Sequence, residues 1–349
     1  NGTILKGTIT SDVTLAAGNT YKLSGEYIVE EGATLHIEEG VKIIAVYDDI
    51  ADYILVKQGG KINAVGTPDK PIVMTSEKEE PGAWGGIHIC GRAHTNAEGG
   101  KGSSEIGGAV YGGNDDADNS GTLQYIRLEY TGFAFDEEHE ANGISFYGVG
   151  NGTIVDHCQA YKGSDDGFEF FGGSVNVSNL VAVSCSDDSF DWTEGWNGKG
   201  TNLVAYQEDK STLGYDCDCL MECDNNGSNN AATPVAHPVL KNLILVGNGG
   251  SKQGIRLRAG TEVEIDNAKV CGKGQPLTVE TALTENALKN GTSKLTNITL
   301  TSELSSKEGI YTHADFIAVT SNKVDANLSY SSFEDIRKEC SWMNGSWVK

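Results

Sequence analysis

The sequence predicts an all-β solenoid in which short parallel strands stack turn upon turn, and three observations support this fold class. First, the stretch from Ser164 to Phe170 (SDDGFEF) recurs approximately from Ser186 to Trp192 (SDDSFDW), at an offset of 186 − 164 = 22 residues, which is typical of solenoids. Second, each copy alternates apolar and charged residues, the period of a strand with one buried face. Third, the 349 residues include 45 glycines and only 6 prolines, and helical periodicity is nearly absent before the last quarter.

The N-terminal part predicts short strands separated by glycine turns. We expect them at 27–29, 31–41, 53–56 and 59–64, and again at 83–89 after the next turn. The segments EEGATLHIEEGVKI and GGKINAVGTPDKPIVMTS in this region resemble the opening turns of bacterial parallel β-helix proteins of the pectate-lyase-like superfamily. The resemblance covers roughly residues 8–275. It implies a right-handed, single-stranded parallel β-helix, and many proteins of this kind are secreted or surface-anchored.

Two insertions interrupt the middle of the predicted β-helix. The first, residues 97–120, ends in Asp116, Asp118 and Ser120, followed by Gly121. Oxygen side chains at alternate positions before a glycine are typical of the start of a calcium loop, although the twelfth position holds Arg127 instead of a glutamate. A calcium site at these three residues is one expectation, and a solvated acidic turn is the other. The second insertion, residues 133–142, is a run of charged residues that favours a solvated loop.

Strands are expected to continue from 143 to 258, with a third polar loop at 224–236. Residues 1–275 are therefore predicted as β-helix turns, and residues 276–349 as the last strands and a cap of the same domain. Within this end, 279–289 and 332–340 predict short helices, and 295–319 predicts further strands. A cap is needed because an open β-helix end exposes unpaired backbone groups.

Composition limits the partners of this chain. Its net charge of 26 − 49 = −23 argues against nucleic acid, whose binding requires Lys and Arg to neutralise phosphates. No apolar run reaches the roughly 20 residues needed to cross a bilayer, and residues 1–6 do not have the pattern of a signal peptide. Eight cysteines give no obvious disulfide framework. A zinc site at Cys217, Cys219 and Cys223 is one reading, and buried free thiols are the other.

Aligning the strands by their alternation predicts one outward column of side chains. Its members, in successive turns, are Ser145, Glu169, Asp191, Glu222 and Arg256. Neighbouring strands lie about 4.8 Å apart, so we expect the adjacent carboxylates to repel one another and at least one carboxyl pKa to rise. A protonated acid beside an ionised one is what glycoside hydrolysis requires.

The order of motifs is similar to that of polygalacturonases, which are β-helix hydrolases. Ser164-Asp-Asp-Gly, the later Asp-Asp pair and Arg256-Leu-Arg258 stand in the same order as the family motifs, although the His-Gly motif is missing. The resemblance implies that Asp187 or Asp188 is the general acid and that Asp166 belongs to the base. It also implies that Arg256 or Arg258 contacts substrate. Trp196, in a turn beside the acidic strand, is a further candidate contact for a sugar.

Two other interpretations stay open. In a calcium-dependent lyase, Glu169, Asp191 and Glu222 would hold the ion and Arg256 would remove a proton. In a structural role, Asp165, Asp166, Asp187 and Asp188 would accept backbone N–H groups at the bends. We predict a monomeric β-helix protein, secreted or on a bacterial surface, that engages a polysaccharide at this column. No cofactor is required in this prediction and Ca²⁺ is optional. A non-catalytic adhesin or envelope component is the alternative.

Overall fold

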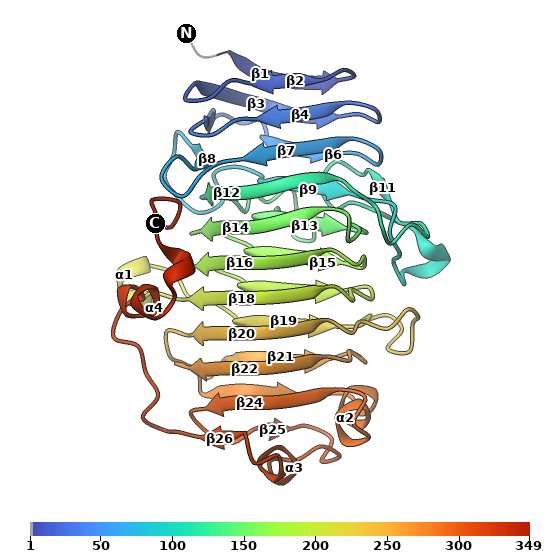
Figure 1. Ribbon diagram of the computed structural model, residues 1–349, viewed down its shortest axis with the longest axis vertical. Coiled ribbons are helices and arrows are strands. Elements are labelled where there is room, and N and C mark those ends of the chain that lie inside the picture. The colour runs from blue at the N-terminus through green and yellow to red at the C-terminus, as the bar shows by residue number, and fades with distance from the viewer. Residues whose placement is uncertain (1–2) are drawn as a thin grey trace.

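The structure, a computed structural model, describes residues 3–349 and is a right-handed parallel β-helix (Figure 1). Asn1 and Gly2, part of the N-terminal stretch judged above, lie outside the described residues. A single 24-stranded sheet winds along the whole length. Each strand in it pairs in parallel with strands of the adjacent turns, as the repeat predicted.

The first nine strands build the N-terminal turns. They are β1 (Ile4–Ile9), β2 (Val13–Leu15), β3 (Thr20–Val29), β4 (Thr34–Ile37), β5 (Lys42–Ala45), β6 (Tyr53–Val56), β7 (Lys61–Val65), β8 (Ile72–Ser76) and β9 (Ile87–Cys90). The insertion that follows contains η1 (Glu98–Gly100) and an antiparallel pair, β10 (Gly102–Ser103) and β11 (Val110–Tyr111).

From β12 onward the strands form two stacks. The long-strand stack contains β12 (Gly121–Glu129), β14 (Ile154–Tyr161), β16 (Asn176–Val183), β18 (Lys199–Tyr206), β20 (Val239–Val246), β22 (Glu264–Cys271), β24 (Lys294–Leu300) and the short β26 (Lys323–Val324). The short-strand stack continues β9 with β13 (Ile144–Tyr147), β15 (Phe168–Phe171), β17 (Phe190–Thr193), β19 (Met221–Asp224), β21 (Gln253–Arg258), β23 (Gln275–Val279) and β25 (Ser305–Ser306).

The interior is a continuous apolar column. The predicted inward residues Ile144, Phe168, Phe190, Met221 and Ile255 are all fully buried and occupy equivalent positions in successive strands. Aromatic rings stack from turn to turn within it, with 5.6 Å between the ring centroids of Phe168 and Phe190. Because the column fills the solenoid, the outward side chains of the short-strand stack are held on a rigid sheet.

Each long strand bends in its middle at a residue with positive φ. In five turns that residue is asparagine, at positions 179, 202, 242, 267 and 297, and asparagine tolerates this conformation better than most residues. The side-chain amides also pair from turn to turn: Nδ2 of Asn202, Asn242 and Asn267 each donates to Oδ1 of the asparagine one turn earlier, at 2.8 to 3.1 Å. We call this row the amide ladder.

One short helix lies between β18 and β19, and the others lie toward the C-terminal end. They are α1 (Lys210–Leu213), α2 (Ala282–Lys289), α3 (His313–Ala318), α4 (Phe333–Glu339) and η2 (Ser341–Met343). Phe316 of α3 is fully buried and belongs to the main core. On α2, the buried carboxylate of Glu285 accepts hydrogen bonds from the backbone N–H groups of Glu308, Ile310 and Tyr311. These contacts close the C-terminal end, as the predicted cap requires, although α3 falls where strands were expected.

The last 25 residues follow a different course. They turn back along the outside of the long-strand stack (Figure 1), where Ile336, Met343 and Trp347 pack against Val181, Val204 and Val246. The side-chain amide of Gln159 exchanges two hydrogen bonds with the backbone of Lys349. The predicted helix at 332–340 is therefore real, but α4 covers a flank of the β-helix instead of its end.

All eight cysteines are buried free thiols, which agrees with the simpler of the two sequence interpretations. Cys219 lies near two carboxylates, but Cys217, Cys219 and Cys223 do not form one ligand group among the described residues. None of the helices in residues 3–349 has the length and hydrophobicity that a membrane crossing requires.

Candidate functional site

The structure aligns the predicted outward column in register. Ser145 lies opposite Glu169, Glu169 opposite Asp191, Asp191 opposite Glu222, and Glu222 opposite Arg256. The insertions before β19 and β21 do not shift the register, because the extra residues bulge from the loops between strands. Four ionisable side chains from four consecutive turns thus meet on one face of the short-strand stack.

The Asp-Asp doublets divide into two roles. Asp166 Oδ1 accepts the backbone N–H of Asp188 at 3.0 Å, and Asp188 Oδ1 accepts that of Cys219 at 3.0 Å. Both residues are buried, and Asp188 is completely so. The second member of each doublet therefore fastens one turn to the next, as the structural interpretation predicted. Asp165 and Asp187, the first members, are partly exposed.

Carboxylates crowd together around the first two turns of this column. We define the acidic half as Asp165, Asp166, Glu169, Asp187, Asp188 and Asp191. Oxygens of Asp165, Asp166 and Asp187 all lie within 4.8 Å of one another, and so do those of Asp166, Glu169 and Asp191. In residues 3–349, none of the six forms an ion pair with a Lys, Arg or His. Among the described residues, no ion pair offsets the charge of the acidic half, and Arg258 acts on Asp191 only through space.

This crowding changes the proton affinity of the acidic half. Burial, reinforced by the charges of Glu105 and Asp165, raises the pKa of Glu169 well above its ordinary value. Burial together with Glu169 and Asp188 does the same for the pKa of Asp191, and burial beside Asp187 raises the pKa of Asp165 to about 8. Close carboxyls that cannot all ionise hold shared protons, so part of the acidic half is protonated at neutral pH.

Neighbouring polar groups support the acidic half. Asn142, at the end of the second insertion, donates from Nδ2 to both Ser145 Oγ and Glu169 Oε1 at 2.9 Å. Glu105, in the first insertion, has its pKa raised to about 7 by burial, an effect that His139 opposes and Glu194 and Glu140 reinforce. Asn142 and Glu105 carry no signal in the sequence, because only the fold brings the two insertions to the edge of this column.

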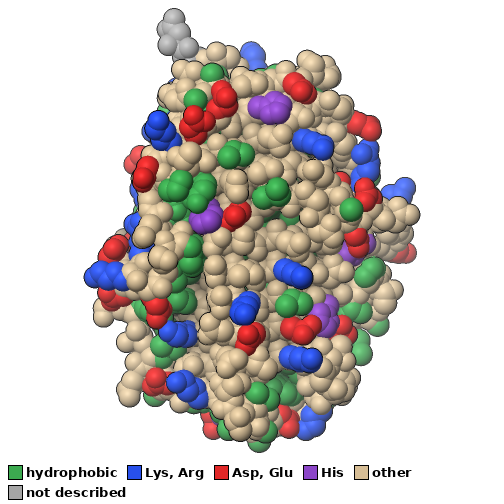
Figure 2. Space-filling view, viewed as in Figure 1, with side chains coloured by type: hydrophobic (Ala, Val, Ile, Leu, Met, Phe, Trp, Pro, Cys, Tyr) green, Lys and Arg blue, Asp and Glu red, His purple; other side chains and the backbone are tan. Residues whose placement is uncertain are grey.

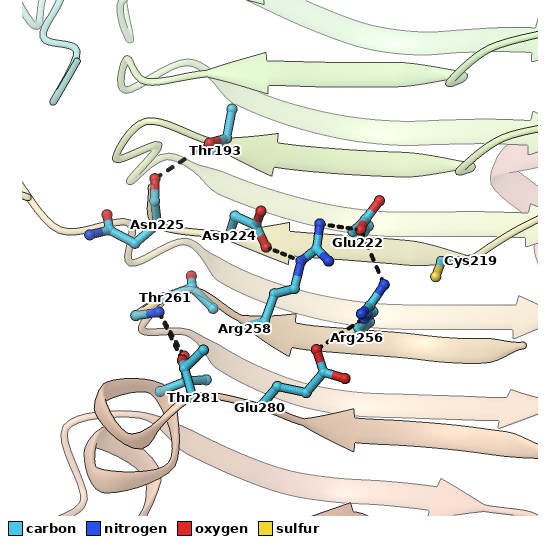
Figure 3. A network of polar contacts seen from close by, with 12 residues as sticks. Thr193, Cys219, Glu222, Asp224, Asn225, Arg256, Arg258, Thr261, Glu280 and Thr281 are labelled. Carbon is cyan, nitrogen blue, oxygen red and sulfur yellow. Dashed lines mark hydrogen bonds and ion pairs between the residues drawn. The ribbon is translucent and has the colours of Figure 1, made fainter. Parts of the chain in front are cut away.

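The next turns are organised differently. We define the paired half as Glu222, Asp224, Arg256, Arg258 and Glu280 (Figure 3). Arg258 donates to Glu222 Oε1 at 2.5 Å and to Asp224 Oδ1 at 2.7 Å, and Arg256 bridges Glu222 and Glu280 at 3.6 and 3.1 Å. Two guanidinium groups thus form ion pairs with three carboxylates, and Figure 3 shows both turned toward their acids.

Pairing with the arginines lowers the pKa of Glu222 but not that of Asp224. Burial alone raises the pKa of Glu222, but the nearby Asp188 carboxyl and the charges of Arg258 and Arg256 outweigh burial, so the pKa falls below its ordinary value. For Asp224, burial outweighs the contact with Arg258, and its pKa remains raised. The pKa values of Asp191 and Glu222, which are neighbours in the column, are therefore shifted in opposite directions.

The tryptophan prediction was wrong. Trp196 is 1% exposed, stacks on Phe170 with 4.0 Å between ring centroids, and donates from Nε1 to the carbonyl of Val175 at 3.0 Å. The turn that carries Trp196 folds inward, so its indole fills the core and cannot stack on a sugar. Trp192 is also buried, as the parity of its strand predicted.

The loop with Asp116, Asp118 and Ser120 uses its oxygens internally. Asp116 Oδ1 accepts from the backbone and the ring of His94 at 3.0 and 2.8 Å. Asp118 accepts the backbone N–H of Arg92 at 3.1 Å and the hydroxyl of Ser120 at 2.9 Å. These contacts fasten the first insertion to the β-helix. Calcium at this loop stays a prediction, and its proposed ligands are already occupied by protein donors.

The fold and this column define the class of protein: a right-handed parallel β-helix with a rigid, acidic outward face. A family model described as "Pectate-lyase like beta helix domain" matches residues 7–348, and the chain therefore belongs to that family. No curated protein and no solved structure matches the chain. Membership in the family gives the fold, and the chemistry has to be argued from the residues.

Proposed function

We propose that this protein is secreted or displayed on a bacterial surface and that it binds a polysaccharide at the acidic half and hydrolyses a glycosidic bond there. The observation that supports this proposal is the cluster of six carboxylates from two consecutive turns without a cationic partner. Such a cluster supplies both a protonated carboxyl and an ionised carboxylate at neutral pH, the pair that glycoside hydrolysis uses.

Exposure assigns the roles within the cluster. Asp166 and Asp188 are buried and accept hydrogen bonds from the backbone, so substrate cannot reach them. Their role is to raise the pKa of the neighbouring carboxyls. Glu169, Asp187 and Asp191 are partly exposed. We assign proton donation to Asp191, whose pKa is raised well above its ordinary value, and activation of water to Asp187, whose pKa burial raises but the contact with Asp165 lowers. Arg256 and Arg258 border the site, and each keeps N–H groups that its ion pairs do not use and that can donate to a sugar.

The experiment is a panel of neutral and acidic polysaccharides assayed for new reducing ends and for absorbance of unsaturated products. It compares the wild-type protein with Asp191→Asn and with Asp12→Asn, a matched loss of charge at a side chain that is 64% exposed in the first turn of the β-helix. We expect new reducing ends without unsaturated products, lost in Asp191→Asn and kept in Asp12→Asn. Cleavage that survives Asp191→Asn contradicts the assignment. No cleavage on the whole panel, with folding intact, favours the non-catalytic adhesin or envelope component.

A second candidate function, a calcium-dependent lyase, is favoured by one observation. Oxygens of Asp188, Asp191 and Glu222 lie within 4.8 Å of one another, and Asp188 Oδ2 is buried without a hydrogen-bond donor. Carboxylate oxygens are the ligands that Ca²⁺ prefers, so these residues fit the ion, which would bridge to a uronate and polarise it. Arg256, the expected base, is held by Glu222 and Glu280. In the same assay, unsaturated products that disappear with chelator would identify the lyase.

A further inference from the structure

A groove separates the amide ladder from the C-terminal segment, on the flank of the long-strand stack. It has a volume of about 400 Å³, within the range of roughly 300 to 1,000 Å³ typical of small-molecule sites. The amides of Asn202, Asn242 and Asn267 line one side, and Ser341 and Trp342 of the η2 segment line the other. This groove has no residue in common with the acidic column.

The amide side of the groove has unused hydrogen-bonding capacity. Each side-chain NH₂ group has two N–H donors. Asn202, Asn242 and Asn267 each spend one on the ladder. The three groups repeat with the spacing of the turns, about 4.8 Å. A row of spare amide donors at a regular spacing suits a ligand that carries several acceptor oxygens.

The rest of the lining is apolar or charge-neutral. Val204, Leu243 and Ile244 contribute to the groove together with the indole of Trp342. The charged lining residues, Lys269 and Glu339, pair with each other at 2.8 Å. Figure 2 shows the molecule from the same side as Figure 1, where acidic and basic side chains are both scattered over the surface and neither sign dominates. In a chain of net charge −23, a groove without net charge selects for a neutral ligand.

We propose that this groove binds a neutral saccharide, with the hydroxyl groups on the amide ladder and the apolar face of the ring against Trp342. A pyranose combines these two surfaces, since its hydroxyls project around the rim and its C–H groups cover the faces. An anionic sugar finds no free cation here, because Lys269 is already paired. The site is independent of the proposed hydrolysis and would serve to hold a glycan chain on the flank of the β-helix.

Calorimetric titration tests the proposal with cellobiose, maltose, xylobiose and mannobiose as neutral probes and digalacturonate as the anionic one. We expect one or more neutral disaccharides to bind, with at least a tenfold loss of affinity in Trp342→Ala and in Asn267→Ala and no change in Asp12→Asn, a control at a 64% exposed side chain of the first turn. Asn267 is the exposed last member of the ladder, so its removal spares the inner amides. Trp342→Phe, which keeps an aromatic face, should retain most of the affinity.

Three results would overturn the proposal. One is no binding of any neutral probe at millimolar concentration while the far-UV spectrum is native. Another is tighter binding of digalacturonate than of every neutral probe. The third is binding that both groove variants leave intact and Asp191→Asn abolishes, which would move the sugar to the acidic column. Failure of the hydrolysis assay alone leaves this site unaffected, because the variants concern different faces.

Discussion

The acidic half and the paired half lie on adjacent turns of the same sheet, yet they treat charge in opposite ways. Glu222 and Asp224 face two arginines that the following strand supplies, whereas Glu169 and Asp191 face other carboxyls and form no ion pair among the described residues. The backbone geometry is the same, since each pair of strands is parallel and in register. The difference teaches that the β-helix backbone only places the side chains. Whether a carboxylate at such a position forms a stabilising ion pair or stays unpaired depends on a few neighbouring side chains.

The largest expected loss of stability comes from breaking the ion pairs of the paired half. Arg258→Ala leaves Glu222 and Asp224, whose side chains are 19% and 18% exposed, without their closest cation. Removing one partner of a largely buried pair typically costs about 3 kcal/mol of unfolding free energy, and urea denaturation at pH 7 measures it. The control, Arg92→Ala, removes a pair with Glu31 whose side chains are 44% and 71% exposed, and should cost less than about 1 kcal/mol. Equal losses in the two variants would contradict the contrast.

A second pair of variants separates structure from charge within the acidic half. Asp188→Ala removes the acceptor of the buried Cys219 N–H, and an orphaned buried donor costs about 2 kcal/mol. Asp188→Asn keeps an acceptor, and its NH₂ group can donate to the carboxylates of Asp191 and Glu222. We expect the asparagine variant to be at least as stable as wild type in thermal unfolding. If asparagine destabilises as much as alanine, the negative charge itself is needed, as a bound cation would require.

The third prediction uses pH. The pKa of Asp165 is about 8 in the folded protein and about 3.9 in an unfolded chain. Between these values the folded state binds more protons, so this group makes stability fall as pH rises from about 4 to 8. Asp191, with a raised pKa, acts in the same direction, and Glu222, with a lowered pKa, acts in the opposite one.

Asp191→Asn should therefore raise the unfolding free energy at pH 8 by roughly 1 to 2 kcal/mol, with a smaller gain at pH 5. Glu222→Gln should lower it at pH 7, because the two arginines lose their shared partner. Urea titrations at pH 5, 7 and 8 give the change of unfolding free energy with pH for both variants. The unbalanced charge of the acidic half would be contradicted by a wild-type unfolding free energy that rises steadily from pH 5 to 8. The same slope against pH in Asp191→Asn would be part of that result.

The smallest expected effect concerns calcium. If Asp188, Asp191 and Glu222 hold the ion with a dissociation constant of about 1 mM, the weak end of the range for extracellular modules, 10 mM Ca²⁺ should stabilise the protein by about 1.4 kcal/mol. The shift in melting temperature should vanish in Asp191→Asn and persist in Asp116→Asn, a variant of the other predicted calcium loop. A shift lost only in Asp116→Asn would place the ion at the first insertion instead.

Local sequence determined most of the fold. The 22-residue repeat and the alternation of Phe168, Glu169 and Phe170 fix which side chains enter the core, because a one-residue change of register would turn an apolar strand face toward water. The same constraint placed Glu169, Asp191, Glu222 and Arg256 in one column despite unequal loop lengths. The role of the Asp-Asp doublets was ambiguous from the sequence, since aspartate is favoured both in turns and in catalytic pairs.

Only the tertiary structure decided how each charge is used. Asn142 and Glu105 reach the acidic half from insertions, and Glu280 reaches Arg256 from the next turn, contacts that no local pattern encodes. Trp196 shows the same limit. Its place in a turn predicts an exposed side chain, but its indole lies in the core, where it stacks on the ring of Phe170. Strand periodicity determines which face a side chain takes. Its burial, its partners and its pKa depend on segments distant in the chain, whose positions are set by packing.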